Sequence, residues 1–147
     1  MNATAQSPSL TVRQEVAASP RELFDAWLDP DELVKWMRPE ASIRSDITND
    51  PRVGGELEVL MHTSRGDFPH TGAYQIIDRP KRLAFTWNSE SAGSRNSLVT
   101  VDFNPAGRGT EVVLKHENLP SQEEADNHRD GWTNVLRQMS QVYAKDA

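Results

Sequence analysis

The segment 128-HRDGWTNVLRQMSQVY-143 belongs to the longest amphipathic stretch of the chain, and it decides how the rest can fold. On a helical wheel centred on Trp132, one apolar stripe about 120° wide appears, formed by Ala125, His128, Val135, Leu136, Met139 and Tyr143. Gly131 stands at the edge of this stripe, where glycine costs a helix roughly 1 kcal/mol relative to alanine. We expect a close approach between the helix and the surface that it covers to offset this cost, with Trp132 projecting inward.

Three positions carry the pattern that begins a helix, namely a capping side chain followed three residues later by glutamate, often with proline at the first helical position. Ser121 begins the long helix, which runs to about Tyr143. Ser19 and Asp29 begin two short consecutive helices, the second of which ends at Pro39. The apolar residues at helical spacing in this pair are Leu23, Phe24, Trp27, Leu28, Leu33, Trp36 and Met37.

Between the second and third helices, apolar residues recur at every second position, as in strands with one buried face. These residues are Leu57, Val59 and Met61; Tyr74 and Ile76; Leu83, Phe85 and Trp87; Val99, Val101 and Phe103; and Val112, Leu114 and His116. Turn-forming sequences follow at residues 49–51, 64–67, 78–81, 91–94 and 104–107. Residues 10–16 and 41–48 are two further candidate strands.

This order predicts an α+β domain with one strand, two short helices, about six hairpin-connected strands and a long C-terminal helix. An antiparallel sheet with one apolar face must be covered, and only the last helix, roughly 33 Å long, can cross it. Gly54, Gly55 and Gly72 would let the sheet bend away from that helix. We expect an apolar pocket in the space so formed, although an ordinary solid core would give the same alternation.

Composition narrows the possible functions. The 147 residues predict one domain, residues 10–147, after a flexible tail at residues 1–9. A net charge of −6 with dispersed Arg and Lys argues against nucleic-acid binding, and the lack of cysteine excludes thiolate chemistry. No apolar run reaches the roughly 18 residues of a membrane span, and residues 1–9 lack a signal-peptide pattern, so we expect no membrane association and a cytoplasmic location.

Five segments together resemble one known family: LDPDELVKWMRP (28–39), RVGGELEVLM (52–61), HTGAYQIIDRPKRLAFTW (70–87), GTEVVLKHENLP (109–120) and GW (131–132). The chain is similar, over residues 10–145, to homologues of the activator of heat shock protein 90 ATPase, in the START-like superfamily of polyketide cyclases, lipid-transfer domains and birch-pollen allergen-like proteins. This resemblance implies a helix-grip fold, in which a curved antiparallel sheet surrounds the C-terminal helix and leaves a hydrophobic cavity. By analogy the cavity is lined by Trp36, Leu57, Val59, Met61, Tyr74, Ile76, Phe85, Trp87, Val101, Phe103, Trp132, Val135 and Met139.

The polar residues suggest no catalytic constellation. The four histidines lack the spacing of a zinc site, so we expect neither a metal nor a cofactor. His116 and His128 share faces with apolar residues, and we expect both to point into the pocket, where an imidazole would orient a polar ligand group or act as a general base. The alternative is a hydrogen-bonded histidine near the rim. Tyr74 likewise is either a polar group of the pocket or a core tyrosine.

Three functions remain open. The first is a binding module that holds a small, largely apolar molecule. The second is a cyclase- or hydrolase-type enzyme in which His116 or Tyr74 acts as acid or base. The third is a stress-related protein that uses its surface to contact a chaperone or a second copy of the chain.

Overall fold

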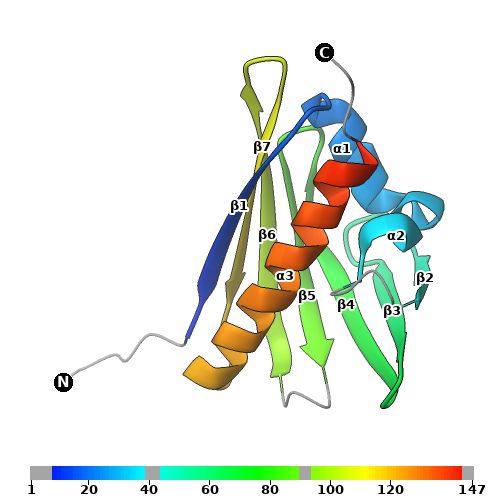
Figure 1. Cartoon of the computed structure of the whole chain (residues 1–147). Coiled ribbons are helices and arrows are strands. Elements are labelled where there is room, and N and C mark those ends of the chain that lie inside the picture. Colours follow the sequence, from blue (N-terminus) through cyan, green and yellow to red (C-terminus); the bar gives the residue numbers. More distant parts are fainter. Residues whose placement is uncertain (1–7, 39–43, 90–93, 144–147) are drawn as a thin grey trace.

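Seven antiparallel strands form one curled sheet around the long C-terminal helix in the computed structural model, which describes residues 8–38, 44–89 and 94–143 (Figure 1). The elements, in chain order, are β1 Leu10–Val16, α1 Pro20–Leu28, α2 Pro30–Trp36, β2 Arg44–Asn49, β3 Glu56–Thr63, β4 Gly66–Asp78, β5 Arg82–Ser89, β6 Ser94–Ala106, β7 Gly109–Glu117 and α3 Gln122–Val142. The strand order is β1-β7-β6-β5-β4-β3-β2. This is the predicted helix-grip fold, with α3 crossing the concave face of the sheet.

The predicted caps begin all three helices. The Ser19 side chain accepts a hydrogen bond from the Glu22 amide at 3.2 Å, and Ser121 accepts one from the Glu124 amide at 3.1 Å. Asp29 accepts from the Asp31 amide at 3.0 Å, one residue earlier than the capping-box pattern suggests. Each cap satisfies an amide that the first helical turn would otherwise leave unpaired.

Most strand boundaries agree with the alternation, and two turn predictions need comment. The turn expected at residues 104–107 is wrong in position, because β6 continues to Ala106 and Pro105 pairs with Thr110 of β7. Gly107, with a φ of 59°, makes the turn possible one step later. Most of the turn expected at 91–94 lies outside the described residues, as does Pro39, and the second helix ends before it at Trp36.

Gly72 marks a close approach between two backbones. A β-carbon placed there would lie 1.8 Å from the Thr86 carbonyl oxygen of β5, which no side chain can tolerate. Just beyond it, the pairing of β4 with β5 shifts register between Tyr74 and Ile76. The shift inserts one extra residue in β4, and such a bulge bends a strand and strengthens its twist.

The bulge overturns one sequence prediction. Tyr74 pairs with Phe85, but Ile76 pairs with Ala84, so Gln75 is the extra residue and the inward–outward alternation reverses after it. Ile76 is therefore 41% exposed and does not line the interior. Its neighbour Ile77 packs against the core instead.

A densely packed core fills most of the space between the sheet and the three helices. The Trp27 ring lies 4.9 Å from the Trp36 ring, 6.0 Å from Phe85 and 6.4 Å from Trp132, measured between centroids. Tyr143 links the end of α3 to α2, since its hydroxyl accepts a hydrogen bond from the Trp36 indole at 3.3 Å and donates to Glu32 at 2.6 Å. The interior of the fold is thus mainly solid along the half of α3 that faces α1 and α2.

Candidate ligand pocket

An open pocket of about 290 Å³ lies where the core ends, between strands β3 to β5 and the N-terminal half of α3. Its walls consist mainly of apolar and aromatic side chains. The lining residues are Met61, Thr63, Phe68, His70, Trp87, Ser89, Asn127, His128, Gly131, Trp132 and Val135.

Strand alternation and helix periodicity place these residues on one surface. Met61 and Thr63 of β3, Phe68 and His70 of β4, and Trp87 and Ser89 of β5 are each two positions apart, so each pair faces the same side of the sheet. On α3, positions 127, 128, 131, 132 and 135 follow the spacing of three and four residues that defines one helix face. The pocket is therefore the continuation of the apolar stripe beyond the packed core.

Gly131 has a different role from the one that its sequence position suggests. It lies in the pocket wall, so its missing side chain leaves room for the pocket between α3 and the sheet. The cost of a helical glycine, roughly 1 kcal/mol, is thus associated with an opening, where we had expected a close contact of backbones.

The predicted lining residues divide into three groups. Five lie in the pocket wall: Met61, Trp87, His128, Trp132 and Val135. Nine are buried in the core and outside the described wall: Trp36, Leu57, Val59, Tyr74, Phe85, Val101, Phe103, His116 and Met139. The last, Ile76, is exposed.

Sequence reasoning missed several pocket residues at the start of β4 and at the ends of the neighbouring elements. They are Thr63, Phe68, His70, Ser89 and Asn127. The alternation of Phe68, His70, Gly72 and Tyr74 could have revealed part of this set. Pro69 obscured it, because proline within a run argues against a strand, yet Pro69 pairs with Leu60 of β3.

His70 forms part of the pocket wall with its ring stacked on Trp87, at 4.9 Å between centroids and 26° between planes. Burial lowers the pKa of its imidazole, while backbone groups of Val59 and Phe68 partly oppose that effect by favouring a protonated ring nitrogen. Nδ1 is covered by protein and has no partner in good hydrogen-bond geometry among the described residues. The accessible edge of the ring is therefore the one that carries Nε2.

His116 lies behind the pocket and is completely buried. Its Nδ1 accepts a hydrogen bond from the Trp132 indole at 3.0 Å, which leaves the proton on Nε2, and Nε2 donates to the Ser97 hydroxyl at 2.8 Å. Ser97 in turn donates to the Trp87 carbonyl oxygen. Burial, with a smaller contribution from His128, lowers the pKa of His116 to about 3. Both ring nitrogens are engaged, so His116 holds Trp132 in place and has no nitrogen available as a base.

His128 lies between this network and the pocket. Its Nδ1 donates a hydrogen bond to the Glu124 carbonyl oxygen at 2.7 Å, and its ring meets that of His116 edge to face at 5.0 Å between centroids. Because a carbonyl oxygen can only accept, the proton is on Nδ1, and the neutral ring keeps Nε2 as an acceptor.

Tyr74 is a core residue, and its hydroxyl lies outside the pocket wall. The hydroxyl accepts a hydrogen bond from Asn49 at 3.0 Å, and the same Asn49 amide donates to the Leu28 carbonyl oxygen at 2.9 Å. Burial raises the pKa of Tyr74, so its hydroxyl keeps its proton. These contacts agree with the alternative prediction, in which Tyr74 is a core tyrosine.

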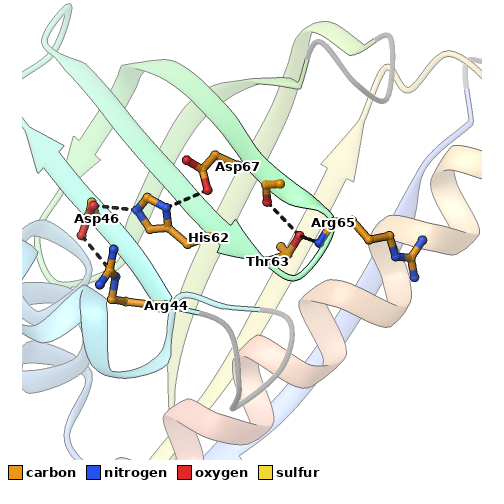
Figure 2. Close-up of polar contacts among 7 residues, drawn as sticks. Arg44, Asp46, His62, Thr63, Arg65 and Asp67 are labelled. Atoms are coloured by element: carbon orange, nitrogen blue, oxygen red, sulfur yellow. Dashed lines mark hydrogen bonds and ion pairs between the residues drawn. The ribbon is translucent and has the colours of Figure 1, made fainter.

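On the other face of β3, His62 joins three strands (Figure 2). Its ring lies between Asp46 of β2, at 2.7 Å from Nε2, and Asp67 of β4, at 2.9 Å from Nδ1. Hydrogen bonds to Asp46 and Asp67 raise the pKa of His62, and Arg44, 4.0 Å from Asp46, weakly opposes this. His62 therefore cross-links the strands best when it is protonated.

The described residues contain no group of three or more His, Cys, Asp or Glu side chains that could hold a metal ion. Within the same residues, no helix is long and apolar enough to cross a membrane.

Comparisons with known proteins identify the relatives of this chain. The family described as activator of Hsp90 ATPase homolog 1-like protein matches residues 17–144. The chain belongs to this family. A search of the curated proteins found no match.

Solved structures share the fold across almost the whole chain. Protein CV1439 from Chromobacterium violaceum is 24% identical, with a TM-score of 0.85, and the similarity covers 94% of this chain and 98% of that one. The AHSA1 protein SPO3351 from Silicibacter pomeroyi is 27% identical, with a TM-score of 0.79 and coverage of 93% and 98%. An AHSA1-like protein from Aeromonas hydrophila is 19% identical, with a TM-score of 0.77 and coverage of 95% and 97%.

Proposed function

We propose that this family member binds a small, largely apolar molecule in the pocket between β3–β5 and α3. The observation that carries the proposal is the wall itself, because Trp87, Trp132 and Phe68 surround an open space with only a few polar groups. Ligand sites in proteins have this composition. An engineered cavity of about 150 Å³ holds benzene, so the pocket of about 290 Å³ has room for a larger molecule.

The enzyme alternative receives no support from His116 or Tyr74, the two residues named as its acid or base. Both nitrogens of His116 are engaged with Trp132 and Ser97, and the Tyr74 hydroxyl is buried against Asn49. A general base needs a free acceptor within reach of its substrate. These contacts therefore leave neither His116 nor Tyr74 available as a base.

The proposal is tested by filling the pocket with a side chain added on α3. Gly131→Leu adds a side chain at the pocket wall and also removes a helical glycine, so we expect unchanged or higher stability together with a loss of binding of at least tenfold. The measurement is titration with N-phenyl-1-naphthylamine, an uncharged probe whose fluorescence rises in apolar surroundings. Val142→Leu, at a position on the same helix that is 41% exposed, is the matched control.

The two variants separate binding in the pocket from binding elsewhere. The control should bind the probe as the unmodified protein does. If Gly131→Leu also binds the probe with unchanged affinity, the ligand site is not this pocket and the proposal is wrong.

A further inference from the structure

The size and walls of the pocket suggest the shape of its ligand. A volume of about 290 Å³ is roughly twice that of the engineered cavity that holds one benzene ring, so two fused rings would fill it. The Trp87 and Trp132 rings lie 5.2 Å apart between centroids and 57° apart in plane, which gives the pocket an aromatic corner. Aromatic rings pack well into such a corner through edge and offset contacts.

The lining also suggests the charge of the ligand. None of the described lining residues is Asp, Glu, Lys or Arg. An ionised group in such a wall would lose its hydration without gaining a charged partner, at a large cost in free energy. The residues therefore favour an uncharged molecule.

The imidazoles of His70 and His128 determine which polar group of a ligand the pocket favours. His128 gives its Nδ1 proton to the Glu124 carbonyl oxygen. The Nδ1 of His70 is covered by protein and has no partner among the described residues, so Nε2 is its accessible nitrogen. In the neutral form His128 thus carries its proton on Nδ1 and keeps Nε2 as an acceptor. Among the described residues neither Nε2 has a hydrogen-bond partner, and neither is covered by protein.

Thr63, another polar residue of the wall, is already occupied. Its hydroxyl donates to the Gly66 carbonyl oxygen at 2.8 Å and accepts from the Arg65 amide at 3.1 Å, as Figure 2 shows. His128 therefore offers an acceptor to the pocket, and the open Nε2 of a neutral His70 can serve as a second one, so both match a donor on the ligand.

We propose that the ligand is an uncharged two-ring aromatic molecule bearing a hydroxyl or N–H donor, which Nε2 of His70 or His128 accepts. This inference rests on the proposed function and adds to it a requirement for a donor. It predicts that methylation of that donor weakens binding, although the added methyl group increases the apolar area of the ligand.

The test uses the whole chain and two matched pairs of probes. Indole and 2-naphthol each carry one donor, which is blocked in 1-methylindole and 2-methoxynaphthalene. Affinities are measured by calorimetry at pH 8, where an ordinary histidine is neutral, and the indole N–H signal of Trp132 in NMR spectra locates the bound probe. We expect the donor probes to bind about five- to tenfold more tightly than their methylated partners, within the roughly two- to twelvefold range of one neutral hydrogen bond.

Phenylalanine variants assign the acceptor, because they keep an aromatic ring in place of each imidazole. In the double variant His70→Phe and His128→Phe, we expect the donor probes to bind about as tightly as the methylated probes. The affinity of the methylated probes should stay unchanged. Each single variant should fold, as judged by circular dichroism, and at least one should reduce the preference. His62→Gln, which changes a histidine on the opposite face of the sheet, is the control and should leave the preference intact.

The outcomes separate this inference from the proposed function. If the methylated probes bind the unmodified protein as tightly as the donor probes, the donor requirement is wrong and the binding function stands. If the preference persists in the double variant, another group accepts the hydrogen bond and the assignment to the imidazoles is wrong. If none of the four probes binds, the proposed function fails and this inference fails with it.

Discussion

The buried His116 makes the stability of the fold depend on pH in a direction that can be calculated. Its pKa falls from an ordinary 6.5 to about 3 in the folded chain. Between these two values the unfolded chain binds a proton that the folded chain does not bind. The stabilisation is fully present above about pH 6.5 and is lost as the pH falls toward 3. Between pH 7.5 and pH 5 this linkage removes about 2 kcal/mol of unfolding free energy.

The perturbation is His116→Gln, which removes the titratable ring. At pH 7.5 the variant should be less stable than the unmodified protein, because the Trp132 indole and the Ser97 hydroxyl lose their shared partner. At pH 5 the difference between the unfolding free energies of the two proteins should be smaller by about 2 kcal/mol. The assay is urea denaturation at both pH values, followed by tryptophan fluorescence.

Trp132→Phe is the matched control, because it removes the indole donor and leaves the imidazole. It should keep most of the pH dependence of the unmodified protein. A second measurement needs no variant, since the ring proton signals of a neutral, buried His116 should not shift in NMR spectra between pH 7.5 and pH 5. Equal pH dependence in His116→Gln and the unmodified protein, or a His116 signal that titrates near pH 6.5, would refute the reasoning.

The remaining predictions concern other parts of the fold. The pKa of His62 is raised, so its contribution to stability is present below pH 6.5 and is lost as the pH rises through the folded value. This loss should lower the melting temperature of the unmodified protein between pH 6 and pH 8.5, and the decline should be absent in His62→Gln. Gly72→Ala should cost about 3 kcal/mol or more by urea denaturation, because its β-carbon meets the rigid Thr86 carbonyl; a cost below about 1 kcal/mol would contradict this. Phe103→Ala should cost about 3–5 kcal/mol and leave probe affinity unchanged, since Phe103 packs against Phe24 in the core; weakened probe binding in the folded variant would contradict the separation of core and pocket.

Local chemistry allowed most of the fold to be predicted. Ser19, Asp29 and Ser121 mark the helix starts because few residue types can satisfy the first amides of a helix. Alternation identified the strands because one face of the sheet is buried. The bulge after Tyr74 leaves no such pattern in the sequence, since its extra residue is apparent only in the pairing with β5. Alternation alone therefore predicts the wrong face for Ile76.

The candidate site was harder to predict than the fold. Periodicity tells which side of an element faces inward, but it does not tell whether a neighbouring element lies in contact with that side. Trp87 and Phe85 have the same alternation, yet only Trp87 reaches the pocket. The partners of His116 could not be foreseen either, because Ser97 and Trp132 meet it only after β6 and α3 have packed.

The pocket occupies one end of the helix–sheet interface, and the packed core occupies the other. Residues that determine what is bound are thus largely different from residues that keep the chain folded. A lineage carrying this architecture can exchange side chains around the opening and acquire a new ligand while the scaffold stays intact, so homologues that superimpose closely are free to differ in what they recognise.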